Sequence, residues 1–584
     1  MPGGFLAFNR EVWYHGDTMA HESATTRIRR VFEAHREFLL LLLLFTAFRL
    51  LALFLLRPGG FIYDYSDYYF FESFAAFSDE GFYPFVHYWM EYPPLFPWMA
   101  VGAYRLGLRF PLWTDPRLAF YSLVGLELLP FEIGCLALIY LIARRVHSPR
   151  VALRCGWIYA LLFVPLYTWT GWFDTMPLFF LLATLYLLLD RRALTAGIAL
   201  GLGFMSKATP AVILPVGWAV LGPQATGRLL DWVKPTPRRI RFVASFAATG
   251  LLIAAPFLWI NPGLLAASFR SMFGRSSWET VWALLDGYTG YGRLGGNRFD
   301  PNPTFATHPT SLPWWLITAT FAVLFLGLYF RNVDWRSPRR AIAFTGLTVC
   351  LFLLYSKGYS PQFLVWLLPF IVIIFPNLRG IGYALLLSVA NIVEWVFYFI
   401  IFPQEPGVLV AAILLRTILI GSVALEFAVR FAAGADSLAR VRRALILGLT
   451  AVSVALPLVS LPHLARVYAE SHAEANPYRT ALVTIQEQAA PGAALLFTDP
   501  QAYRQFYPFL WPRNTLRVLR EGDDLAALIA GRPEAWLVRG DTPLDDAVGE
   551  GAQQWLEDHF SPIEAVTTPR LRLRSYRREG VQRE

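Results

Sequence analysis

The residues best suited to chemistry gather in residues 61–98, where two acids, Asp64 and Asp67, stand three positions apart. A third acid, Glu91, is followed by Tyr92 and two prolines, which hold it at a rigid break in the chain. A carboxylate can take the proton of an attacking hydroxyl as a general base. Two carboxylates can instead hold a divalent cation, because magnesium commonly uses few protein ligands. We therefore expect a site on this stretch.

Asp67 also has a plain structural reading. Residues 67–80 place phenylalanines mostly on one side of a helix, and Gly81 follows as a natural stop. We expect this helix to lie in the membrane interface with its aromatic face towards lipid. Asp67 is then its N-cap and Asp64 a turn residue. The residues alone leave the structural and the chemical reading open.

A second group of polar residues belongs to later loops. Asp174 precedes an apolar segment, where an N-cap role is the alternative, and Lys207 stands between two apolar segments with few polar neighbours. A lysine there must extend to the interface or meet an anion, because an unpaired charge at membrane depth is costly. The remaining candidates for binding an anionic substrate are Lys357, Gln362, Arg293 and Arg298, the last two in a loop that also holds Arg270, Arg275 and His308.

The rest of the chain must hold these residues at a membrane. Of its 584 residues, 56% are hydrophobic and 16% are charged, against roughly 25% charged in a soluble domain. We predict about thirteen spans, because many apolar runs approach or exceed the ~18 residues that indicate a membrane helix. They are 37–56, 118–143, 151–169, 175–190, 193–206, 208–222, 241–260, 312–330, 341–356, 361–376, 380–402, 407–430 and 443–461.

The charges of the loops predict the orientation. Arginines gather in alternate connections, which become cytoplasmic if the N-terminal segment 1–36 is cytoplasmic. We therefore interpret the net charge of +9 as a membrane bias and expect no nucleic-acid partner. No cleavable signal peptide is expected. Loops 57–117 and 261–311 and the segment 462–584 then lie on the outer side.

Two further expectations concern packing. Segment 462–584 predicts a small α/β domain, with strands at 493–497, 535–539 and 571–576 and helices at 523–530 and 545–559. Charged residues inside the spans should turn inward and pair: Glu127, Glu132, Glu394, Arg416 and Glu426.

The chemistry that fits is transfer from a membrane-bound donor activated by phosphate. Acids on the outer face can deprotonate an acceptor hydroxyl, and cations on the same face can stabilise a leaving phosphate. The sequence contains no Gly-rich phosphate loop, no zinc spacing and no Gly-x-Ser-x-Gly elbow.

The motifs, taken in order, resemble the GT-C superfamily of integral-membrane glycosyltransferases, which use polyprenyl-phosphate-linked sugars. The resemblance covers roughly residues 37–460. Within the superfamily, the chain looks most similar to bacterial relatives of the mannosyltransferase of glycolipid-anchor synthesis. Its motifs are Asp64-Tyr-Ser-Asp67, Gly81-Phe-Tyr-Pro84, Glu91-Tyr-Pro-Pro, Gly171-Trp-Phe-Asp174, Gly203-Phe-Met-Ser-Lys207 and Ser356-Lys-Gly-Tyr-Ser-Pro-Gln362.

This resemblance implies a mainly α, polytopic bundle in the plasma membrane and an inverting transfer of a hexose such as mannose. The acceptor is a lipid, a glycan or a protein. The catalytic base falls on Asp67 or Asp64, and we favour Asp67 because it begins a helix. Glu132 matches a supporting acid of the family. We expect a supporting role for Tyr92 as well. Many members carry Asp-x-Asp here, whereas this chain has Asp-x-x-Asp, which leaves a Mg or Mn ion on Asp64 and Asp67 open.

Two other functions remain as alternatives. A lipid or solute transporter (or flippase) predicts matching broken helices in two halves of the chain, and no such symmetry is visible. A ligase or polymerase of a lipid-linked glycan could use the same scaffold.

Overall fold

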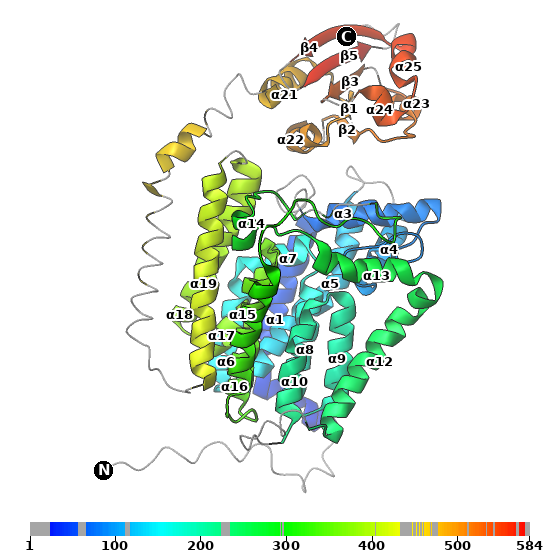
Figure 1. Cartoon of the computed structure of the whole chain (residues 1–584). Helices are drawn as coiled ribbons and strands as arrows, with labels where there is room; N and C mark the ends of the chain where they lie inside the picture. The colour runs from blue at the N-terminus through cyan, green and yellow to red at the C-terminus, as the bar shows by residue number, and fades with distance from the viewer. Residues whose placement is uncertain are drawn as a thin grey trace, which may run out of the picture.

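The structure is a computed structural model, and the chain it describes is mainly helical with one small sheet near the C-terminus (Figure 1). The described residues are 24–55, 66–110, 117–223, 234–292, 294, 297–402, 405–432, scattered positions between 447 and 469, 477–510, 513–532, 534–540, 543–567 and 571–577. This arrangement confirms the predicted class, a helical membrane bundle with a C-terminal α/β part.

Six of the described helices are long and apolar enough to cross a membrane, and a seventh span results if the bent pair α6 (Pro149–Leu161) and α7 (Phe163–Gly171) counts as one. The apolar part of α1 has 24 residues, which extends about 36 Å and exceeds a hydrocarbon core of ~30 Å. The six are α1 (Ala24–Leu55), α5 (Arg117–Arg144), α12 (Pro237–Ile260), α16 (Pro338–Tyr355), α18 (Leu378–Ile392) with its π-helical continuation η5 (Val393–Ile401), and α19 (Pro406–Ala432).

The other predicted spans are shorter helices, so a count of thirteen is not confirmed. They are α8 (Thr175–Leu189), α9 (Ala193–Ser206), η3 (Thr209–Ile213) with α10 (Leu214–Leu221), α15 (Trp314–Tyr329), and η4 (Pro361–Trp366) with α17 (Leu368–Ile374). The 15 residues of α8 extend only about 22 Å. The last predicted span, 443–461, falls mostly outside the described residues. Short helices let their connecting loops lie inside the protein, which is where the site is found.

Local sequence explains where several helices begin and how two of them pack. Prolines occupy the first helical position of α6, α12, α13 (Pro262–Gly274) and α16, where their missing N–H is no loss. Gly197 and Gly201 on α9 face α12, and a Cβ on Gly197 would lie 2.0 Å from Ser245 Oγ. Small residues four apart allow this close approach of two membrane helices.

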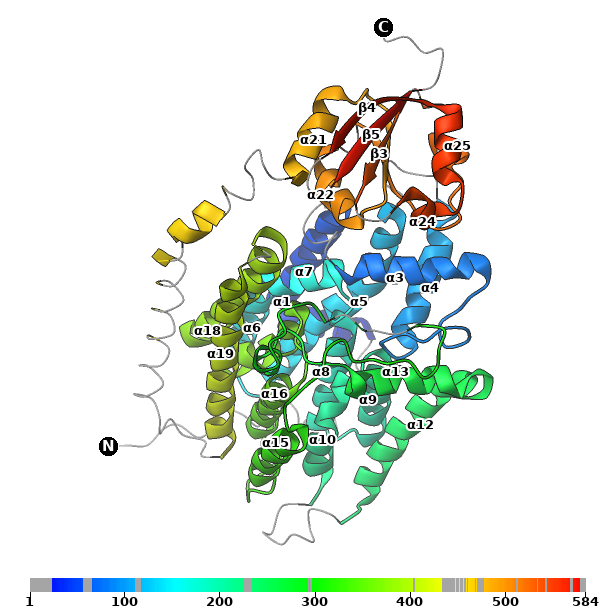
Figure 2. The same ribbon diagram turned by 45° about the horizontal axis from the view of Figure 1, so that its top comes forward.

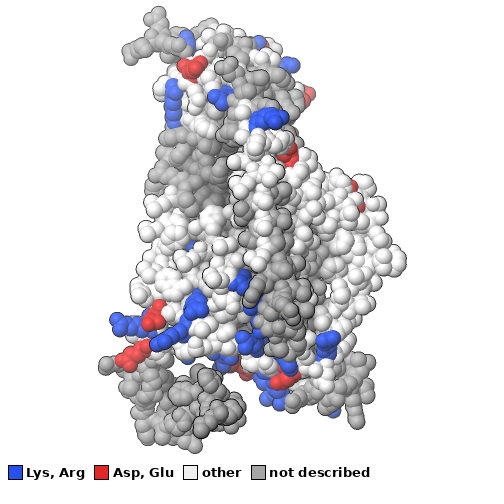
Figure 3. All heavy atoms as spheres, turned by 90° about the vertical axis from the view of Figure 1, so that its left-hand side faces the viewer, with Lys and Arg blue, Asp and Glu red and all other residues white. Residues whose placement is uncertain are grey.

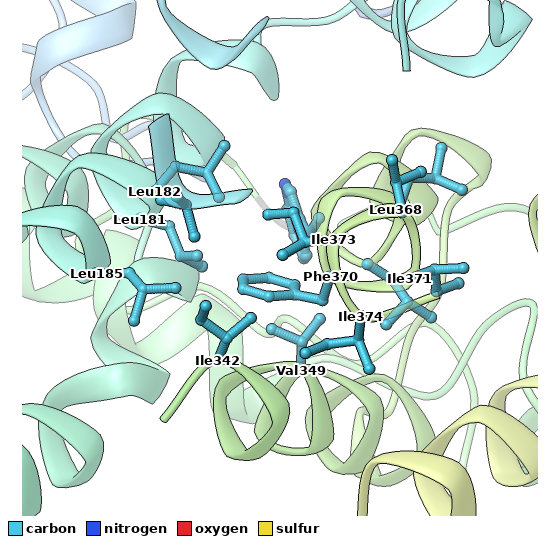
Figure 4. Packing of buried hydrophobic residues seen from close by; sticks show 14 of the residues in the cluster. Leu181, Leu182, Leu185, Ile342, Val349, Leu368, Phe370, Ile371, Ile373 and Ile374 are labelled. Atoms are coloured by element: carbon cyan, nitrogen blue, oxygen red, sulfur yellow. The ribbon is translucent and has the colours of Figure 1, made fainter. Parts of the chain in front are cut away.

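The centre of the bundle is a dry apolar core (Figure 4). Phe370, Ile371, Ile373 and Ile374 of α17 pack with side chains of α8 and α16. Every residue of α17 is buried, which explains why this helix is apolar on all its faces.

Two helices that line the site, α3 (Asp67–Ala75) and α13, lie across the upper end of the bundle together with α4 (Leu95–Gly107) (Figures 1 and 2). The short helix η2 (Ala76–Glu80) follows α3 in the chain. Gly81 ends η2 in the left-handed conformation, with φ of 78°, which confirms it as the stop. The predicted lipid-facing orientation of the aromatic side chains is wrong. Phe71 packs edge-on against Phe96 and Phe173, and Phe74 packs against Tyr88, so α3 buries its aromatic face against protein.

Most of the predicted intramembrane charges pair inward, as expected. Glu132 bonds Arg49 at 2.9 Å, and both side chains are fully buried. Glu394 pairs with Arg416, and Glu426 lies 3.2 Å from Arg379. Glu127 differs, because it makes no ion pair with any residue that the structure describes.

The C-terminal part is a five-stranded sheet with strand order β2-β1-β3-β5-β4. The first three strands pair in parallel, and β3, β5 and β4 pair antiparallel. Helices cover both faces, α21 and α22 on one and α23 to α25 on the other. The bounds are α21 (Pro477–Gln488), β1 (Ala494–Phe497), α22 (Pro500–Leu510), β2 (Thr515–Val518), α23 (Leu525–Ile529), β3 (Glu534–Arg539), α24 (Leu544–Val548), α25 (Ala552–His559), β4 (Ser561–Thr567) and β5 (Arg572–Arg577).

This small domain lies above the same end of the bundle as α3 and α13 (Figure 1). The guanidinium carbon of Arg117, at the start of α5, stands 4.5 Å from the ring centre of Tyr507 on α22. Figure 3 shows lysines and arginines at the opposite end of the bundle and on the domain itself, with an almost uncharged band between them. Such a band is what an integral membrane protein presents to lipid.

Candidate active site

A cavity of about 690 Å³ lies where α3, α13 and the short loops of the bundle meet. It collects most of the predicted site residues from distant parts of the chain. Those that line it are Asp67, Glu91, Tyr92, Lys207, Arg298, Lys357 and Gln362. Two predicted residues, Asp174 and Glu132, do not line it, and two others, Asp64 and Arg293, lie outside the described residues.

Asp67 occupies the first turn of α3, and the N-cap is Ser66, whose hydroxyl accepts a hydrogen bond from the Tyr68 N–H at 3.4 Å. The interpretation of Asp67 as the N-cap is therefore wrong, because Ser66 already has that role. The carboxyl lines the cavity instead. Burial raises its pKa to about 7; Lys207 opposes the shift, and the negative charges of Glu91 and Asp174 add to it.

If Asp67 acts as a general base, its raised pKa predicts a specific pH dependence of the activity. Below about pH 7 Asp67 holds a proton and cannot accept another, so activity should rise with pH through an apparent pKa of about 7 and then level off. The measurement is kcat/KM between pH 5 and 9. An acid limb that stays near pH 4 would contradict this placement of the base.

Glu91 is held by Arg298, at 2.6 Å between the carboxylate oxygen and the guanidinium nitrogen. Arg298 also stacks on the ring of Trp89, with 4.1 Å between its guanidinium carbon and the ring centre, and its carbonyl accepts a hydrogen bond from the Trp89 N–H at 2.9 Å. The loop 297–302 is thus fastened to the loop that carries Glu91.

Lys207 does not snorkel. It begins the loop after α9 and is 5% exposed, with Nζ donating to Asp174 Oδ1 at 2.7 Å. Four aromatic rings surround the ammonium at 4.7 to 5.1 Å from their centres: Tyr92, Phe173, Phe363 and Trp366. The anion that Lys207 meets is therefore a carboxylate of the protein itself. Asp174 is fully buried, and its side chain makes no capping hydrogen bond to α8.

Two further cationic residues, Arg275 and Lys357, also line the cavity. Arg275 packs on Trp278, with 3.5 Å between the guanidinium carbon and the ring centre, and donates to the Gly292 carbonyl at 2.6 Å. Its Nε has no hydrogen-bond partner among the described residues. Lys357 donates to the carbonyls of Phe273 and Arg275 at 2.8 and 3.3 Å. Burial lowers the pKa of both groups, which Glu91 opposes at Arg275 and Asp286 opposes at Lys357.

Arg275 is a cavity residue that the sequence-based prediction missed, because it chose Arg293 and Arg298 from the same loop. The pairing of the loop with residues 357–359, which brings Arg275 into the cavity, has no local signature. Gln362 lines the same cavity with its Oε1 buried and unpartnered among the described residues. Glu132 does not line the cavity. Its ion pair with Arg49 joins α5 to α1.

The metal expectation stays a prediction. Within the described ranges there is no group of three or more His, Cys, Asp or Glu side chains placed to hold a metal ion. Asp64, the second proposed ligand, lies outside those ranges.

Comparisons with known proteins found one family model and several solved structures. Residues 108–356 match the model of Glycosyltransferase family 87. Among solved structures, ArnT from Cupriavidus metallidurans bound to undecaprenyl phosphate is 15% identical, with 91% of this chain and 97% of that chain covered and a TM-score of 0.40. The apo form of the same protein is 15% identical with the same coverage and a TM-score of 0.38. The Archaeoglobus fulgidus oligosaccharyltransferase is 14% identical, with 81% and 60% covered and a TM-score of 0.29.

A comparison with curated proteins gave no significant match. The family match spans less than half of the chain, and it includes Asp174, Lys207, Arg275 and Arg298 but begins after α3. The resemblance to membrane glycosyltransferases is therefore confirmed, and the family that matches residues 108–356 is glycosyltransferase family 87.

Proposed function

We propose that the protein is an inverting glycosyltransferase that moves a hexose, with mannose as the first sugar to test, from a polyprenyl-phosphate donor to an acceptor hydroxyl. The acceptor is a lipid, a glycan or a protein. The observation that carries this proposal is one cavity in which Asp67 shares walls with four cationic residues, Lys207, Arg275, Arg298 and Lys357.

In the proposed reaction the acceptor oxygen attacks the anomeric carbon on the face opposite the phosphate, and Asp67 takes the hydroxyl proton. The bond between the anomeric carbon and the phosphate oxygen breaks, and its electron pair stays on the phosphate. The configuration at that carbon inverts. Arg275 and Lys357 are the groups we assign to the phosphate, because cations aimed at a developing charge stabilise the transition state.

We assign supporting roles to the remaining predicted residues. Glu91 is neutralised by Arg298 and keeps that arginine beside the cavity. Lys207 lines the cavity and is held by the buried Asp174, and its ammonium lowers the pKa of Asp67. Gln362 offers a free carbonyl oxygen to a substrate hydroxyl. Glu132 stabilises the bundle, and Tyr92 places its ring against Lys207.

We propose that this end of the bundle faces away from the cytoplasm, with the N-terminus inside and residues 462–584 outside. The arginine-rich connections at the other end support this orientation. A reporter enzyme that is active only outside the cytoplasm, fused after residue 577, should be active; an inactive fusion would reverse the orientation.

A transporter is less well supported, because α3 and α13, which line the cavity, lie at one end of the bundle (Figure 1). A ligase or polymerase of a lipid-linked glycan would differ in the size of the group transferred. Mass spectrometry of lipids from cells that lack the protein separates transfer of a single sugar from transfer of a glycan. We expect a polyprenyl phosphate carrying one sugar to accumulate, whereas a long lipid-linked glycan would favour the ligase, and an unchanged lipid pool would contradict a lipid-linked donor.

A further inference from the structure

Glu279 lines the same cavity from a loop between α13 and α14 (Val281–Leu285), and it has an unusual backbone. Its φ is 52°, in the left-handed region that residues with a Cβ seldom occupy. Such strained positions concentrate at ligand sites, where the surrounding structure enforces them. The loop therefore has to be held by contacts that can be identified.

The residues on both sides of Glu279 are fixed to loop 356–360. The Trp278 N–H donates to the Lys357 carbonyl at 3.0 Å, and the Tyr359 N–H donates to the Trp278 carbonyl at 3.1 Å. The Trp278 ring fits where two glycines leave room: a Cβ on Gly292 or Gly358 would lie 2.3 or 1.9 Å from it. Thr280 Oγ1 donates to the Lys357 carbonyl at 3.1 Å.

The backbone of Glu279 itself is held from inside the bundle. Arg416 donates to its carbonyl oxygen and is paired with Glu394. Arg416 also stacks on Tyr359, with 3.6 Å between the guanidinium carbon and the ring centre. This arginine therefore fixes the main chain and leaves the glutamate side chain for another partner.

The carboxyl of Glu279 accepts a hydrogen bond from the backbone of Gly292, but one of its oxygens stays without a partner among the described residues. Glu279 is 5% exposed, and this oxygen, Oε2, is buried. Burial raises its pKa well above the ordinary value, and the negative charge of Glu394 adds to the shift, while Arg416 opposes it. A carboxyl that keeps its proton both donates and accepts hydrogen bonds, and it does not repel a neighbouring phosphate.

The surroundings indicate which ligand this carboxyl meets. Arg275 lies within electrostatic reach of both Glu91 and Glu279, and Lys357 is bonded to the loop that carries Glu279. These are the two cations assigned to the donor phosphate. A group bonded directly to that phosphate must lie beside them, and in the proposed donor that group is a sugar ring.

We propose that Glu279 binds the sugar of the donor, with its carboxyl hydrogen-bonded to a ring hydroxyl, and that Arg416 is the positioning residue that aims it. This assignment rests on the proposed function, because it takes a phosphate-linked sugar as the ligand. It adds a specificity-determining residue to the cavity that Asp67 also lines. The expected consequence is that Glu279 contributes to recognition of the sugar but not of the lipid phosphate.

The test compares binding of polyprenyl phosphate with binding of the same lipid carrying mannose, glucose or galactose, using the full chain in nanodiscs. Wild type should bind one sugar-bearing lipid more tightly than the bare phosphate. In Glu279→Gly, which keeps a backbone at φ of 52° without strain, that advantage should fall about tenfold, since one buried hydrogen bond is lost. Affinity for the bare phosphate should stay unchanged, and Glu279→Gln should keep most of the advantage.

A thermal unfolding midpoint at or above that of wild type would show that Glu279→Gly is folded. The proposal is overturned if this variant keeps the full sugar-dependent advantage, or if no sugar improves binding to wild type. Catalysis is not needed for this readout. Asp67→Asn should bind the sugar-bearing lipid normally without transferring it, so failure of the base assignment and failure of the Glu279 assignment give different results.

Discussion

Replacing Asp67 with asparagine is expected to lower sugar transfer at least about 100-fold, because a positioned general base contributes roughly 10² to 10⁴ in rate. Asparagine has nearly the same shape, so it should fit at the first turn of α3 without disturbing Ser66, which caps the helix. The loss should appear in kcat with little change in KM. The measurement is initial transfer rate in proteoliposomes at pH 8, where the wild-type carboxyl is ionised.

Asp79→Asn is the matched control for this change. Asp79 lies in the same connection, 57–117, but it is exposed and does not line the cavity. Its carboxylate pairs with Arg105 at 2.8 Å. Its replacement should leave the rate within about twofold, since an exposed ion pair contributes roughly 0.2–1 kcal/mol. A wild-type rate in Asp67→Asn, or equal losses in the two variants, would contradict the assignment of the base.

Replacing Lys207 with methionine should have the largest effect on stability. The variant leaves the fully buried Asp174 without its cation, and breaking a buried pair by removing one partner typically costs about 3–5 kcal/mol. The measurement is the free energy of unfolding of the protein in a lipid-like detergent. The double variant Lys207→Met with Asp174→Leu should recover most of the loss, because no unpaired charge then remains.

The same lysine gives a second, independent readout. Lys207 lowers the pKa of Asp67 by more than Asp174 raises it, so in the double variant the acid limb of the pH profile should move to higher pH. Arg105→Met, which breaks an exposed pair, is the control and should change stability by no more than about 1 kcal/mol. Full stability of Lys207→Met would contradict a buried pair.

Local signals predicted well what depends on neighbours in the chain. Gly81 ends its helix as expected, and the strands at 494–497, 534–539 and 572–577 fall within one residue of their predicted places. The choice of cap was wrong, because Ser66 and Asp67 both suit an N-cap and only the backbone geometry separates them.

What depends on distant contacts could not be read from the sequence. An aromatic stripe on a helix suits lipid or protein equally, and α3 buries its stripe against Phe96 and Phe173. The partner of Lys207 is 33 positions away, and the two arginines that bring Glu279 and Glu91 to the cavity come from other elements. The predicted number of spans is not confirmed, for a related reason: helices of 14 or 15 residues, such as α8 and α9, are stabilised by burial in the bundle rather than by their length.

The central claim is that one cavity transfers a sugar from a lipid phosphate. It is tested most directly by supplying purified protein in liposomes with polyprenyl phosphate carrying isotopically labelled mannose, glucose or galactose, together with a cell-envelope extract as acceptor. Lipid and product are then followed by mass spectrometry, with and without a chelator. The account predicts that one labelled sugar leaves its lipid, that free polyprenyl phosphate appears in equal amount, and that the sugar joins an acceptor with inverted configuration. Retained configuration, or release of sugar that Asp67→Asn does not reduce, would contradict it.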